Sequence, residues 1–181
     1  MNVRLLTASL IVQVALFMSG CEVLFTNPPA GNPEKDKALL GRWISEEKDK
    51  ESSTQVRFDQ GSHDQMNISF IPGDPNERNP VFTAKLTKLG TQSYLILNPT
   101  DEDRDKGFLI AKYEIRQDEL TVWIQNSEKV KALINQKIIK GEVRAPGAVV
   151  TESSENVTKF LQSSVAEKTF ELFGKFKKAK G

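Results

Sequence analysis

Between Gly41 and about Gln125, apolar side chains recur at every second position in short runs. Alternation of this kind is typical of strands that bury one face. The alternating positions are Val56 and Phe58; Met66, Ile68 and Phe70; Phe82, Ala84 and Leu86; Leu109, Ala111, Tyr113 and Ile115; and Leu120, Val122 and Ile124. The run from Tyr94 to Leu97 is continuously apolar, which indicates a more central strand. Polar spacers containing Gly, Pro, Asn and Asp separate the runs, so we expect an antiparallel meander.

The last third of the chain has a mixed pattern. Apolar residues after Ser127 fall on one helical face, and Ser153 or Ser154 is suited to cap a second helix. The two apolar faces comprise Val130, Leu133, Ile134 and Ile138, and then Val157, Phe160, Leu161 and Val165. Strand pieces are expected between the helices at 142–143 and 149–151. The run 170–173 fits either an extension of the second helix or a closing strand, and we expect residues 174–181 to form a basic tail.

A short helix is expected ahead of the strands. Asn32-Pro33-Glu34 has the order of a helix start, with a cap, a proline in the first turn and an acid, and Gly41 is a plausible stop. The whole pattern predicts a mainly β, α+β protein. We expect a single β-rich domain over residues 33–173, with one or two helices in its C-terminal third.

The N-terminus has the three parts of a secretory signal peptide. Met1 to Arg4 carries one positive side chain, Leu5 to Met18 is uncharged and mostly apolar, and the small residues Ser19 and Gly20 precede Cys21. Met18-Ser19-Gly20-Cys21 resembles the lipobox of bacterial lipoproteins, with Met18 in the place where Leu is usual. The alternative is an ordinary signal peptide followed by a chance cysteine.

The lipoprotein resemblance implies a location and an anchor. Residues 1–20 would be removed, Cys21 would become the acylated first residue, and residues 21–32 would form a tether to the membrane. An aspartate directly after the cysteine resembles a signal for retention in the inner membrane. This chain has Glu22 at that position instead, which favours the periplasmic face of the outer membrane and leaves the inner membrane possible.

Charge and cysteine content narrow the classes of partner. The chain has 25 Lys and Arg residues against 24 Asp and Glu, and removal of Arg4 with the signal makes the mature chain neutral. A neutral domain gives no support to nucleic-acid binding. Acylation would use the single cysteine, so the mature domain is expected to be stable without an intramolecular disulfide.

Gly41-Arg42-Trp43, at the head of the first strand, resembles the Gly-x-Trp signature of lipocalins. In that family the Trp lies at the closed end of an eight-stranded barrel, packed under a basic side chain from a late strand. The resemblance implies a calycin-like β-barrel with Gly41 and Trp43 as its structural motif. The helix inserted before the final strands departs from the lipocalin pattern.

No residue pattern indicates catalysis or a cofactor. The acids Asp101, Glu102, Asp103 and Asp105 invite a calcium hypothesis, but basic residues are interleaved with them, and we expect a solvated hairpin loop without metal. His63 is the only histidine and is expected in an exposed turn. The sequence lacks a nucleophile elbow and a phosphate-binding loop, so we do not expect an enzyme.

Two non-catalytic functions are compatible with the sequence. The first is a membrane-anchored binding module that holds a small apolar ligand in the barrel or a protein partner in the envelope. The second is a structural or assembly lipoprotein with a filled core. The volume of the interior separates them, because Ala84 and Ala111 could leave space, whereas Phe58, Phe70 and Phe82 could fill it.

Overall fold

The computed structural model describes residues 23–46, 54–62, 64–71, 81–99 and 107–179. The predicted signal peptide with Met18, Ser19 and Gly20, the lipidation residue Cys21, His63 and the acidic loop 101–105 all lie outside these residues. Predictions that concern them remain predictions.

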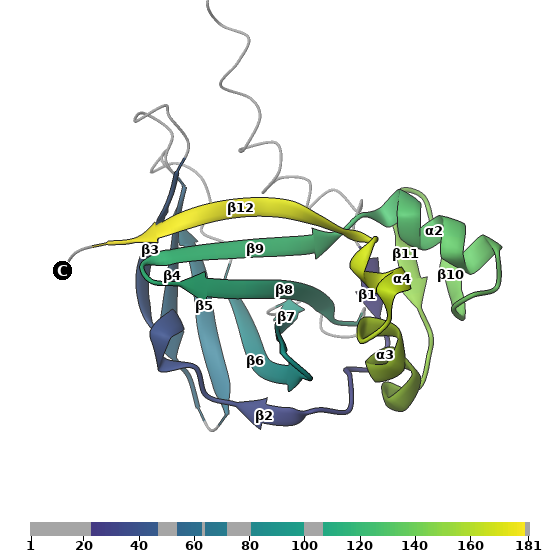
Figure 1. The fold of residues 1–181 in the computed structure, drawn as a ribbon, viewed down its shortest axis with the longest axis horizontal. Helices are drawn as coiled ribbons and strands as arrows, with labels where there is room; N and C mark the ends of the chain where they lie inside the picture. Colours follow the sequence, from purple (N-terminus) through teal and green to yellow (C-terminus); the bar gives the residue numbers. More distant parts are fainter. Residues whose placement is uncertain (1–22, 47–53, 63, 72–80, 100–106, 180–181) are drawn as a thin grey trace, which may run out of the picture.

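A closed antiparallel β-barrel forms the larger part of the molecule (Figure 1). Within the described ranges, eight strands form a ring in the order β6-β5-β4-β3-β12-β9-β8-β7, and β7 pairs back with β6. In chain order these strands are β3 (Gly41–Ser45), β4 (Gln55–Gln60), β5 (Gln65–Ile71), β6 (Val81–Leu89), β7 (Gln92–Pro99), β8 (Leu109–Arg116), β9 (Glu119–Gln125) and β12 (Phe170–Lys178). A short strand, β2 (Asn32–Glu34), pairs with the end of β6. The mainly β fold class and the predicted barrel are confirmed.

The alternating residues of the sequence form the barrel core. One cluster of buried side chains contains the inward positions of β4 to β6, β8 and β9, together with Leu39, Trp43, Leu95 and Phe176. The pattern therefore assigned the inner face of each of these strands correctly, because one face of every strand meets the interior and the other leaves it.

A second layer covers the outside of β7 and β8. It consists of a three-stranded sheet, β1 (Val23–Phe25), β10 (Gly141–Val143) and β11 (Ala148–Val150), and of the helices α2 (Ser127–Asn135), α3 (Ser154–Leu161) and α4 (Ser164–Glu167). Its core includes Phe25, Val130, Val157 and Phe160, packed with the outward side chains Tyr94, Ile96 and Ile110 of the barrel.

Ser153 caps α3 as expected, since its hydroxyl accepts a hydrogen bond from the Asn156 amide. The helices lie in the C-terminal third, with α4 as an additional short turn.

The N-terminal segments differ from the prediction. The described part of the expected tether, residues 23–32, is packed on the body: β1 is buried and pairs in parallel with β11, and the Ala30 amide donates to the Ser154 carbonyl. Asn32-Pro33-Glu34 is strand β2 and not a helix start. The helical turn comes later, as the 3-10 helix η1 (Lys37–Leu39), and Asp36 caps it. Pairing with β6 outweighs the local capping signature here.

The expected basic tail is also wrong for its described part. Residues 174–178 belong to β12, which pairs with β9 along most of its length and with β3 at its end. This strand closes the barrel between the first and the last strands of the meander. The open alternative for residues 170–173 is therefore resolved in favour of a closing strand.

Candidate functional site

The interior of the barrel holds a small apolar cavity. Its volume is about 40 Å³, and the described residues that line it are all apolar. Ala111 borders the cavity, as expected of a small inward residue, and Phe58, Phe70, Phe173 and Phe176 occupy the space around it. Four aromatic side chains thus line this small cavity.

One end of the cavity is ringed by half-buried apolar side chains. Phe70, Leu97, Ile124 and Phe173 pack against the interior from the ends of β5, β7, β9 and from the start of β12. Phe82 adds an edge-on contact to Phe70, with ring centroids 5.9 Å apart. Antiparallel pairing brings these positions to the same rim, which is the end of the barrel away from Trp43.

The opposite end is closed by η1 and Trp43. The Trp43 side chain is fully buried, and its indole Nε1 donates to the Leu39 carbonyl at 2.7 Å. Leu39 is itself fully buried beside it. Gly41 has φ +113°, a backbone conformation that favours glycine and turns the chain from η1 into β3.

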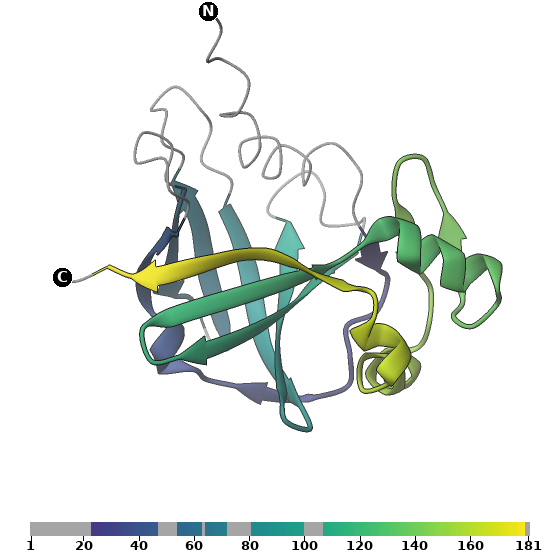
Figure 2. The same cartoon turned by 45° about the horizontal axis from the view of Figure 1, so that its top comes forward.

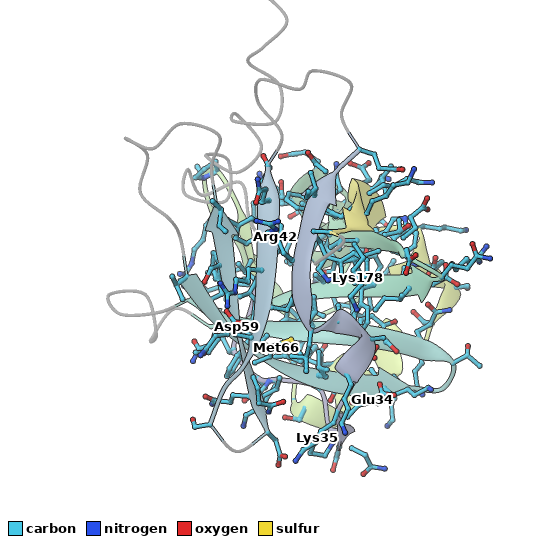
Figure 3. All side chains as sticks on the ribbon, turned by 90° about the vertical axis from the view of Figure 1, so that its left-hand side faces the viewer. Glu34, Lys35, Arg42, Asp59, Met66 and Lys178 are labelled. Atoms are coloured by element: carbon cyan, nitrogen blue, oxygen red, sulfur yellow. The ribbon has the colours of Figure 1, made fainter. Side chains whose placement is uncertain are left out.

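Lys178 covers Trp43 from outside the core. Its Nζ lies 5.2 Å from the centroid of the Trp43 ring and donates to the Ala38 carbonyl at 2.7 Å. Figure 3 shows this end of the barrel, with Lys178 and Arg42 beside β3 and with Glu34 and Lys35 beyond η1. One ammonium group therefore joins the last strand to the first strand and to the helical turn between β2 and β3.

A polar contact seals the same end from the side of β8. The Tyr113 hydroxyl donates to Asp36 Oδ2 at 3.2 Å, while Asp36 Oδ1 accepts the Ala38 amide at 3.0 Å. Burial raises the pKa of Tyr113 well above its ordinary value, and the charges of Asp36 and Glu34 raise it further. The raised pKa keeps the Tyr113 hydroxyl protonated, as its hydrogen bond to Asp36 requires.

Sequence reasoning missed a buried lysine on the outer wall. Lys112 is 6% exposed, and its Nζ lies 4.9 Å from the Trp123 ring centroid and 5.4 Å from that of Phe170. It also forms an ion pair with Glu167 of α4. The sequence signal was a charged residue within a long apolar strand. Trp123 is its neighbour in the β8–β9 hairpin, but Glu167 and Phe170 are far along the chain.

The described residues that line the cavity offer apolar packing, and none of them carries a reactive group. Among the residues described, no three or more His, Cys, Asp or Glu side chains gather so that they could hold a metal ion. None of the described helices has both the length and the apolar character needed to cross a bilayer.

No protein-family model, curated protein or solved structure matches the chain. Functional proposals for it therefore rest on its sequence and its structure.

Proposed function

We propose that this chain is a lipid-anchored, non-catalytic protein of the bacterial cell envelope whose barrel is a filled scaffold. Acylation of Cys21 holds it at the membrane, with the periplasmic face of the outer membrane favoured by Glu22. In this proposal the protein acts through its outer surface, on a protein partner of the envelope. The lipobox-like residues Met18 to Cys21 support the anchor.

The observation that carries the scaffold proposal is the size of the interior cavity. Its volume is about 40 Å³. Sites for small molecules usually measure about 300–1,000 Å³. Even an engineered apolar cavity that binds benzene has a volume of about 150 Å³. The interior therefore supports the filled-core function over a ligand held inside the barrel.

We also propose that the barrel is calycin-like. The closed ring of strands, the buried Trp43 and the cover of Lys178 from the last strand support this relation. They repeat what the Gly-x-Trp resemblance implies, including a basic side chain over the Trp. In this proposal the calycin-like architecture is retained while the ligand space is filled.

Titration with apolar probes tests the filled scaffold. The soluble chain from Glu22 onward should show no saturable binding of benzene or of palmitate in calorimetry. Phe176→Ala removes a buried ring from the cavity wall and should create a benzene site. Phe173→Ala removes a half-buried ring at the rim of the same cavity, and it serves as a second variant that should disturb the fold less. Stoichiometric palmitate binding by the unmodified chain would contradict the proposal and favour a ligand-binding barrel.

A further inference from the structure

The folded body begins almost directly after the predicted lipid-bearing residue. Val23, Leu24 and Phe25 are 5%, 8% and 0% exposed, and the following residue, Thr26, donates its amide to the Val150 carbonyl. Two residues span at most about 7 Å, even when fully extended. An acyl chain on Cys21 would therefore be fixed next to the start of β1, with no spacer to let the body move away.

The pairing of the small sheet determines which surface lies there. β1 runs parallel to β11 with Val23 opposite Ala148, and β10 runs antiparallel to β11 with Val143 opposite the same Ala148. The start of β1 and the turn 144–147, which leads into β11, therefore lie at the same end of the small sheet. Figure 2 shows the β10–β11 turn projecting from the side of the body at which β1 begins.

This turn has the composition of a membrane contact. Val143 is 47% exposed, and Ala145 and Pro146 are also exposed. The Arg144 guanidinium is paired with Glu142 at 2.8 Å. Lys131 Nζ donates to the Pro146 carbonyl at 2.8 Å, which holds the turn on α2. The tip therefore presents apolar side chains beside one paired Arg144, is supported from behind and is close to neutral.

We infer that the β10–β11 turn, residues 143–147, rests in the interface of the bilayer that holds the acyl chain. This inference depends on the proposed acylation of Cys21. The occupant of the surface is phospholipid, because the anchor and the turn are at the same end of the sheet and apolar side chains are favoured at the boundary between headgroups and acyl chains. Since Arg144 is paired, contact should not require anionic lipid.

The test places a fluorophore on the acylated full-length product in vesicles. Acylation occupies Cys21, so Ala145→Cys provides a unique thiol at the turn, and Ser62→Cys provides an exposed control in the β4–β5 turn at the far end of the barrel. An environment-sensitive label is read against vesicles containing nitroxide-labelled lipids. We expect several-fold stronger quenching at position 145 than at position 62, with a blue-shifted emission. The result should be the same in phosphatidylcholine and in mixtures with phosphatidylglycerol.

A second pair of variants tests the apolar contact itself. Val143→Glu should remove most of the quenching at position 145, whereas Leu172→Glu, at another exposed apolar residue, should not. Intact mass reports acylation separately. An acylated protein that is quenched equally weakly at both positions overturns the inference alone. A protein without the acyl mass overturns the proposed anchor, and the inference with it.

Discussion

The ammonium group of Lys178 lies 5.2 Å from the centre of the Trp43 ring, and the two residues are also opposite each other in the pairing of β12 with β3. The same group donates to the Ala38 carbonyl of η1. The last strand, the first strand and the turn that closes the barrel therefore meet at one side chain. Ring closure joins segments that are far apart in the sequence, so this contact is expected to stabilise the whole barrel.

Replacement of Lys178 by Met should lower the free energy of unfolding by about 1–2 kcal/mol, because it removes a cation–π contact and a charged hydrogen bond. Lys177→Met is the matched control. Lys177 lies on the same strand, and its ion pair with Glu46 is largely exposed. Urea unfolding of both variants provides the measurement. Equal, small effects of the two substitutions would show that Lys178 contributes nothing beyond a surface charge.

Truncation of Trp43 to Ala should cost about 3–5 kcal/mol, because the indole is fully buried and its Nε1 donates to the Leu39 carbonyl. That loss is a large share of the roughly 5–15 kcal/mol typical of a domain. Thermal unfolding followed by circular dichroism is sufficient to detect it. A melting temperature within a degree or two of the parent would contradict the structural role of Trp43.

The Lys112–Glu167 pair should respond asymmetrically to substitution. Glu167→Ala leaves the Lys112 ammonium buried between two rings without its carboxylate partner, which should cost about 1–3 kcal/mol. Lys112→Met should be close to neutral, because replacing a buried charge by an apolar side chain of similar volume avoids its desolvation. Chemical unfolding of both variants tests the order. A greater loss in Lys112→Met would mean that the cation itself stabilises the wall.

Glu152 should make stability depend on pH in the acid range. Its carboxylate accepts the Lys140 amide at 2.8 Å, and this bond lowers the pKa of Glu152, with help from Asn156. Because the pKa is lower in the folded state, the carboxylate stabilises the fold fully above the unfolded-state pKa of about 4.3. This stabilisation is lost as the pH falls through the folded-state pKa. Glu152→Gln should therefore be less stable than the parent at pH 7 and approach it near pH 3.

The matched control for this prediction is Glu155→Gln on the exposed face of α3. Unfolding by urea at pH 7, 5 and 3 should show a changing difference from the parent for Glu152→Gln only. A constant difference across this range would mean that the substitution acts through packing rather than through the charge.

The sequence predicted the barrel wherever local alternation could report burial. Phe58, Ile68 and Leu120 each alternate with polar neighbours, and all three are buried inside the ring. The closing strand was one of two alternatives for residues 170–173, and its continuation through 174–178 was missed, because a register shift between Leu172 and Gly174 interrupts the alternation of β12. Lysines after that break resembled a solvated tail, although one of them covers Trp43.

The sequence also did not predict features that depend on residues far away in the chain. β1 has three residues and no measurable period, and it is specified by parallel pairing with β11, more than a hundred residues later. Lys112 occupies an outward position of β8, which in an isolated barrel would face water. It is buried only because α4 and the start of β12 fold over that wall. The Gly-x-Trp motif was the one local pattern that predicted the position of the closed end of the barrel.

Anchoring of the protein to the envelope through lipid on Cys21 is tested most directly by intact mass spectrometry of protein purified from the membrane fraction. We predict a chain that begins at Cys21 and carries the mass of a diacylglyceryl group, together with loss of both features and of palmitate labelling in Cys21→Ser. A chain that retains residues 1–20 with a free thiol, or a Cys21→Ser variant that still incorporates palmitate, would contradict the claim.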